Sequence, residues 1–171
     1  MAILKVARMG NPVLRQKANP IPVESIQSQP IRQLIQDMLE TVIEYDGVGL
    51  AAPQVHRSVR LVLLCLDHEA GFEVWINPVI TPIDDELVTT TEGCLSVPDL
   101  RGDVTRPSKV RVQALNQNGQ ALDRVLEGFP AVVAQHECDH LDGTLYVDNA
   151  DTRTLSFLDE HHRYSVLDEA E

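Results

Sequence analysis

Apolar side chains near the start of the chain recur with the period of an amphipathic helix. From Ile31 onward they occupy positions i, i+3, i+4, i+7, i+8, i+11 and i+12, which places them in one stripe. Ser28 and Pro30 suit the first turn, because serine caps helices and proline fits their first positions. The pair Asp46-Gly47 provides a stop, since glycine readily adopts the left-handed conformation found after helices. The pattern predicts a helix between these signals.

Shorter apolar runs closed by turn residues fill the middle of the chain and predict β-strands. The predicted strands are 59–66, 74–76, 79–83, 87–91, 109–115 and 120–126. The last two flank an Asn118-Gly119 turn, which favours a hairpin. A second helix is predicted over 130–142, with Pro130 at its start and Gly143 after its end. A helix, several strands and a further helix indicate the α+β fold class.

The chain becomes acidic from about residue 148. Residues 148–171 hold seven acidic side chains against two arginines, so we expect a solvated tail with at most one short element. No repeat, low-complexity stretch or linker interrupts the 171 residues. We therefore expect residues 1–171 to form a single domain, since domains of this length are common.

The overall charge excludes several kinds of partner. With 14 basic and 26 acidic side chains the net charge is −12, which disfavours direct nucleic-acid binding and contact with anionic membranes. The longest apolar run, LVLLCL at 61–66, is far too short to span a membrane. No signal or transit peptide is visible. The chain has three cysteines, a small and odd number that argues against a disulfide framework. We expect a cytoplasmic protein.

The second predicted helix carries the pattern H-E-x-x-H at 136–140. His136 and His140 lie about 40° apart around a helix axis, so both imidazoles can reach one metal ion. Glu137 lies about 60° from His140, beside such an ion, where a general base for a metal-bound water belongs. Cys138 falls about 160° from His140 and is interpreted as a core thiol. The alternative is a helix with two surface histidines.

A catalytic metal usually has a third protein ligand, and the residues leave its identity open. Tyr146 stands where an extended H-E-x-x-H-x-x-G-x-x-H pattern would have a third histidine, which disfavours that class of protease. Glu160 offers a carboxylate twenty residues beyond His140, but within a polar acidic stretch. Cys94 offers a thiolate, which with two imidazoles suits iron(II) or zinc. A buried, inert thiol is an equally good interpretation of Cys94.

A third segment of interest, GVGLAAPQ at 47–54, follows the first helix. Its glycines and alanines leave little bulk, so the backbone there can approach a flat or narrow partner closely. Gln54 then offers a polar group from a tight apolar turn. The alternative is a plain glycine-rich loop; no lysine follows it, so a phosphate cradle is disfavoured.

Together, three segments resemble the peptide deformylase family. They are GVGLAAPQ at 47–54, EGCLS at 92–96 and QHECDH at 135–140, and their order and spacing match the family over about residues 2–147. The resemblance implies an α+β fold with mixed or antiparallel sheets around the motif-bearing helix. It also implies a hydrolase that removes the formyl group from N-formylmethionine of nascent polypeptides and releases formate.

The resemblance further implies a role for individual residues. Cys94, His136 and His140 would hold one divalent metal per chain, natively iron(II), with zinc or nickel able to replace it. A metal-bound water would attack the formyl carbon, with Glu137 as general base and then acid. Gln54 and the backbone N–H of Leu95 would face the developing oxyanion.

The resemblance also places the substrate. Substrate backbone would pair along the small residues near Gly49, and an apolar pocket would receive the methionine side chain. The family's pocket positions correspond to Val48, Phe129, Val132 and Val133. Ordinary core packing is the alternative for each of these four. Asp139 is expected to orient a histidine or an arginine, and Arg106 is a candidate partner for a buried carboxylate.

Two features depart from the family pattern. Cys138 stands where a larger apolar residue is common, and we expect it to add sensitivity to oxidation. Many members end in a basic helix that docks on the ribosome, whereas the segment after Val147 is acidic here. The sequence does not support ribosome contact by that route.

Two rival functions remain at this point. The first is an H-E-x-x-H metallopeptidase with Glu160 or Tyr146 near the metal. The second is a non-enzymatic domain stabilised by a metal, which would need a fourth protein ligand in place of water.

Overall fold

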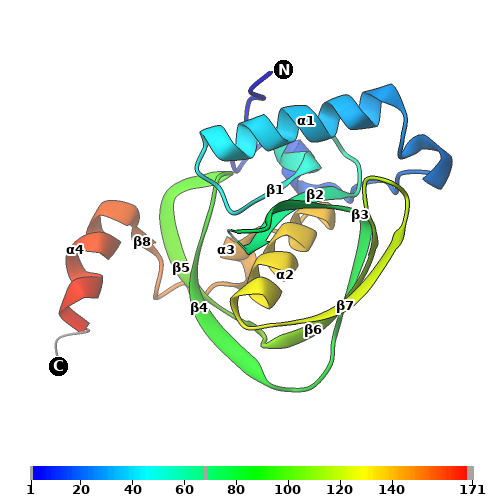
Figure 1. Ribbon diagram of the computed structural model, residues 1–171. Coiled ribbons are helices and arrows are strands. Elements are labelled where there is room, and N and C mark those ends of the chain that lie inside the picture. Colours follow the sequence, from blue (N-terminus) through cyan, green and yellow to red (C-terminus); the bar gives the residue numbers. More distant parts are fainter. Residues whose placement is uncertain (1, 68, 169–171) are drawn as a thin grey trace.

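Two antiparallel sheets and a central helix make up the computed structural model, which describes residues 2–67 and 69–168 (Figure 1). One sheet has the strand order β1-β2-β3-β6-β7 and the other the order β4-β5-β8. The strands are β1 Gly49–Ala51, β2 Leu61–Asp67, β3 Gly71–Pro82, β4 Leu87–Cys94, β5 Val97–Pro107, β6 Lys109–Leu115, β7 Ala121–Glu127 and β8 Ser156–Phe157. The α-helices are α1 Gln29–Glu44, α2 Phe129–Leu141, α3 Tyr146–Asn149 and α4 Leu158–Asp168. The α+β prediction is confirmed.

The strand β2 lies between the two long helices because both of its faces are apolar. Leu61 and Leu63 belong to the cluster that packs against α1, with Met38 and Val42 on the helix side. The alternate residues of β2 belong to a second cluster, which contains the buried face of α2. Side chains of a strand alternate between its faces, so one continuous apolar run serves two cores.

The helix α2 is buried on nearly all sides, which sets the environment of the H-E-x-x-H pattern. It lies inside the fold, surrounded by strands (Figure 1). Ala131 and Ala134 are fully buried and pack in one cluster with Trp75 of β3. His136 and His140 are buried on the same helix. The interpretation as a helix with two surface histidines is therefore wrong.

Two element boundaries differ from the predictions. The helix α1 is followed by Asp46 with φ 52°, so aspartate rather than Gly47 takes the left-handed position. Ser28 occupies the N-cap position but makes no side-chain capping bond. The predicted strands 74–76 and 79–83 are parts of one strand, β3, with an irregularity between Ile76 and Val79.

The sequence predicts no strand over β5, yet β5 is the centre of the second sheet. Its inward positions include Gly102, Val104 and Arg106, all buried. Glycine and arginine do not produce an apolar alternation, so the pattern of the strand is hidden.

The segment after residue 148 is largely exposed to solvent, as expected, but it holds more ordered structure than one short element. The strand β8 pairs with β5, and α4 follows it as an 11-residue helix. In Figure 1, α4 lies apart from the sheets on the outer side of β5. No helix among residues 2–67 and 69–168 has the length and apolar character needed to cross a membrane.

Candidate active site

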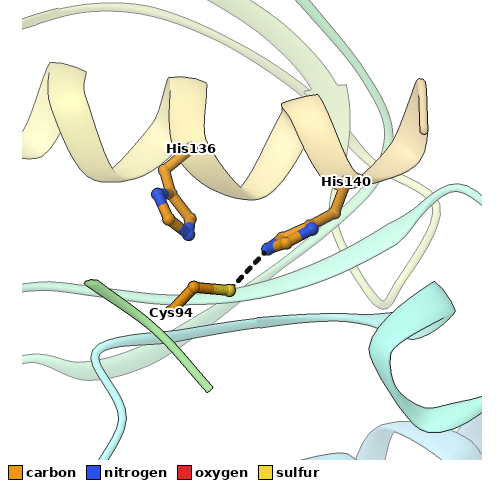
Figure 2. A group of neighbouring side chains, drawn as sticks. All are labelled: Cys94, His136 and His140. Atoms are coloured by element: carbon orange, nitrogen blue, oxygen red, sulfur yellow. Dashed lines mark hydrogen bonds between the residues drawn. The ribbon is translucent and has the colours of Figure 1, made fainter. Parts of the chain in front are cut away.

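Cys94, His136 and His140 form a tight cluster between α2 and the end of β4 (Figure 2). One ligand atom from each lies within 4.8 Å of the others, and Cys94 Sγ is 3.3 Å from His140 Nε2. The histidines project from successive turns of α2, and Cys94 is the last residue of β4. The donor set of one thiolate and two imidazoles fits iron(II) or zinc.

Cys94 is the residue that the fold brings to the two histidines. Tyr146 instead donates its hydroxyl to the Leu100 carbonyl at 2.9 Å, and its ring stacks on His136 at 6.0 Å. Glu160 lies on α4, where it pairs with Arg163 at 3.0 Å. Among the described residues, no cluster of potential metal ligands includes Glu160. The geometry therefore does not support the metallopeptidase arrangement.

A cleft of about 610 Å³ opens beside this cluster. All of the residues expected to contact substrate line it, as do Cys94, His136, Gln54, Leu95 and Glu137. The expected substrate contacts are Val48, Gly49, Phe129, Val132 and Val133. His140 is fully buried and lies outside the cleft wall.

A buried carboxylate fixes the orientation of His136. Glu92 Oε2 lies 2.7 Å from His136 Nδ1, so that Nδ1–H donates and the Nε2 lone pair is left for the cluster. Glu92 is also held by Arg106, whose Nε is 2.5 Å from Oε1 and whose Nη2 is 3.0 Å from Oε2. Arg106 Nη1 donates to Asp139 Oδ2 at 2.8 Å. The expected partnership of Arg106 with a buried carboxylate is confirmed, and it includes Asp139.

Glu92 is not among the site residues predicted from the sequence. Glu92 contacts His136 and Cys94 contacts His140, so both side chains point toward α2. The strand pairing is irregular between Glu92 and Cys94, so simple alternation along β4 does not predict this. Recognising the network also required the position of Arg106, which lies 14 residues beyond Glu92 on the neighbouring strand β5.

The charged groups of this buried network stabilise one another's ionised forms. Burial opposes ionisation of Glu92, but the bonds from His136 and Arg106 lower its pKa. Burial likewise disfavours a charge on Arg106, yet Glu92 and Asp139 raise its pKa. Burial also disfavours a charge on His136, while the adjacent Cys94 and Glu92 raise its pKa well above the usual value. Burial lowers the pKa of His140 and keeps it neutral, the form that binds metals.

Glu137 is placed for proton transfer. Its side chain is buried, and burial raises its pKa to about 7. Its Oε2 has no hydrogen-bond partner among the described residues. A buried carboxylate oxygen without a protein partner fits a water molecule in the cleft.

Gln54 is held rigidly beside Cys94. Its Oε1 accepts the Ala51 N–H at 2.7 Å, while Nε2 lies 3.2 Å from Ser96 Oγ and 3.5 Å from Cys94 Sγ. The amide therefore presents N–H groups toward the end of β4. Leu95 lies in the short turn between β4 and β5, directly after Cys94.

Cys138 faces away from the cluster, as expected. It is buried and lines a separate hollow with Arg60 and Asp142. Burial strongly raises the pKa of its thiol, so it stays protonated. A protonated, buried thiol is a poor nucleophile, which argues against the expected sensitivity of Cys138 to oxidation.

An α+β fold around an H-E-x-x-H helix, with a cysteine beside both histidines, defines a class of candidate metal-dependent hydrolases. Residues 3–155 match the model of the polypeptide deformylase family. A peptide deformylase of Leptospira biflexa is 41% identical over 91% of this chain and 92% of its own. The chain therefore belongs to the polypeptide deformylase family, which is a family of enzymes.

Solved structures give the same result. The peptide deformylase of Thermotoga maritima superposes with a TM-score of 0.83 at 37% identity, covering 88% of this chain and 99% of that one. A class I type b peptide deformylase from Acinetobacter baumannii, bound to Met-Ala-Ser, gives a TM-score of 0.82 at 38% identity. That match covers 86% of this chain and 98% of the other.

Proposed function

We propose that this chain removes the formyl group from N-formylmethionyl peptides by metal-assisted hydrolysis, as members of its family do. The cluster of Cys94, His136 and His140 carries this proposal, together with Glu137, whose Oε2 has no hydrogen-bond partner among the described residues. The three donors would hold one divalent ion, and iron(II) is the native ion that we propose. When bound, such an ion lowers the pKa of water and polarises a carbonyl oxygen.

Glu137 would act as the base and then the acid. It takes a proton from water in the cleft as the formyl carbon is attacked, and passes that proton to the leaving amine. Its raised pKa, about 7, suits both roles near neutral pH. The Glu92–His136 bond keeps the imidazole in the tautomer that leaves Nε2 free for the ion.

Gln54 and Leu95 would stabilise the oxyanion. The bond from the Ala51 N–H orients the Gln54 amide and keeps its NH2 group next to Cys94, close to where negative charge would develop. The backbone N–H of Leu95 follows Cys94 directly and is the second proposed donor. Loss of one such donor typically lowers the rate by about 10²–10³.

The substrate would lie as an extended strand in the cleft. Gly49 of the edge strand β1 lines one wall and supplies backbone groups for pairing. An apolar wall formed by Val48, Phe129, Val132 and Val133 would receive the methionine side chain. The Acinetobacter relative was solved with Met-Ala-Ser, the peptide that remains after deformylation of formyl-Met-Ala-Ser.

Formate release from formyl-Met-Ala-Ser, measured on anaerobically purified protein, tests the proposal. Glu137→Gln should lower kcat by at least about 10³ while metal content stays the same. An unformylated Met-Ala-Ser-containing peptide should not be cut. Internal cleavage of unformylated peptides without formate release would favour a metallopeptidase instead.

A further inference from the structure

Residues 150–157, which lead to α4, make contacts along residues 100–104 of β5. Ala150 bridges to Val104, the Asp151 N–H donates to the Asp103 carbonyl at 2.9 Å, and Thr154 Oγ1 accepts the Asp103 N–H at 2.8 Å. Residues 150–157 therefore contact residues 104–100 in antiparallel order, through a bridge at Ala150 and the short strand β8, with a turn over 152–154 between them.

The contacts continue to the end of this segment. Gly102 lacks a side chain where Leu155 packs: a Cβ there would lie 2.7 Å from Leu155 Cδ2. Ser156 pairs with Arg101, and Phe157 pairs with Leu100. These backbone hydrogen bonds and packing contacts together fix the position of the next residue, Leu158.

Leu158 lies in the wall of the active-site cleft. It is half-buried and is the first residue of α4. The match to the family model ends at residue 155, so Leu158 lies just beyond the residues that the model covers. Arg101, which pairs with Ser156, also lines the cleft and lies against Gly93, next to Cys94.

Leu158 and the residues of the proposed methionine pocket line the same cleft but come from different helices. Phe129, Val132 and Val133 belong to α2, whereas Leu158 begins α4 on the outer side of β5. Figure 1 shows β4 and β5 between these two helices. Side chains of an extended peptide alternate in direction, so when the methionine points toward α2 the next side chain turns toward other parts of the cleft wall, which include Leu158.

We propose that Leu158 contacts the second residue of the substrate and favours an apolar side chain there. This inference rests on the proposed deformylase function and adds a determinant of specificity contributed by the C-terminal segment. Leu158 is the aliphatic residue that this segment contributes to the cleft wall.

Two formylated peptides that differ at the second residue test the proposal: formyl-Met-Leu-Ser and formyl-Met-Gly-Ser. Wild-type protein should have the higher kcat/KM for the leucine peptide. Leu158→Ala should lower kcat/KM for that peptide by roughly threefold to tenfold, and change the glycine peptide less than about twofold. Leu158→Met should restore most of the selectivity, because it replaces the lost apolar contact.

A matched control is Tyr164→Ala, an exposed residue of the same helix that does not line the cleft. It should leave the ratio of the two kcat/KM values unchanged. An equal loss for both peptides in Leu158→Ala, or an unchanged ratio, would overturn the assignment of Leu158 while formate release still supports the deformylase. Absence of formate release from metal-loaded wild-type protein would overturn both.

Discussion

Gly49 and Glu137 are packed so closely that a Cβ atom on Gly49 would lie 2.4 Å from Glu137 Oε1. It would also lie 2.7 Å from Cδ and Cγ of the same side chain. The backbone of the edge strand β1 is thus in direct contact with Glu137, the proposed catalytic base. Glycine at this position serves the placement of Glu137 as well as the expected pairing with substrate.

Gly49→Ala should therefore reduce catalysis without removing the metal. The added methyl group forces the Glu137 carboxylate to move, and displacements of about 1 Å commonly cost about 10² in rate. Steady-state formate release and metal content, measured on the same preparation, check this. In a Glu137→Gln background the same substitution should add little further loss, because it acts through Glu137. An additional full loss there would contradict the account.

Glu92→Gln should weaken both metal binding and the fold. It removes the negative charge that holds His136 Nδ1 and leaves the buried Arg106 with Asp139 as its remaining acidic partner. Breaking a buried ion pair costs about 3 kcal/mol or more, and loss of such a ligand-orienting bond costs roughly 10–100-fold in metal affinity. Urea unfolding and metal titration measure the two effects.

The exposed pair Arg111–Asp123 provides the control for Glu92. Its side chains are 56% and 42% exposed, so Asp123→Asn should leave the unfolding midpoint and metal affinity nearly unchanged. If Glu92→Gln behaved like this surface variant, the buried network would have no role in holding His136.

Asp148→Asn should lower the free energy of unfolding near neutral pH but not at acidic pH. The hydrogen bond from Arg15 is the main reason that the pKa of Asp148 is lowered, and the backbone N–H of Leu145 lowers it further. A lowered folded-state pKa means that the carboxylate stabilises the fold above its ordinary value of 3.8, and that this contribution is lost as pH falls below it. Solvent screens the half-exposed pair, so the difference at pH 7 should stay below about 1 kcal/mol.

Unfolding of both proteins between pH 7 and pH 2.5 checks the Asp148 prediction. The two unfolding free energies should converge toward the acid end. Asparagine keeps an oxygen for the Leu145 N–H, so the comparison isolates the charge. A constant or widening difference toward acid would contradict the assigned pair.

Metal removal should expose Cys94 to alkylation while Cys138 stays unreactive. Cys94 lines the cleft, whereas the Cys138 thiol is buried with a raised pKa. Iodoacetamide should label Cys94 after chelation, and added metal should protect it. Peptide mapping by mass spectrometry identifies the labelled cysteine. Rapid labelling of Cys138 would contradict its placement.

The residues of the proposed metal site could be predicted from the sequence better than the sheets around them. Spacing alone placed His136 and His140 on one face of a helix, and the structure confirms that arrangement. It could not choose between Cys94 and Glu160, because they are far from the helix in sequence and only strand pairing brings one of them close. The resemblance to the family, rather than spacing, selected Cys94.

The missed elements have a common physical cause. The inward face of β5 holds Gly102 and Arg106, whose burial depends on Leu155 and Glu92 in distant segments. The C-terminal segment is polar in composition, yet its backbone bonds to β5 order it. Local sequence patterns indicate which apolar side chains are buried. Neither β5 nor the C-terminal segment is held in place mainly by such burial.

The most direct test of the central claim joins metal content to activity in Cys94→Ala. Wild-type protein purified without oxygen should hold close to one iron, zinc or nickel ion per chain and release formate from formyl-Met-Ala-Ser in proportion to it. Cys94→Ala should lose most of the metal and the activity together. Wild-type protein that binds metal fully without releasing formate, or Cys94→Ala that keeps both, would contradict the account.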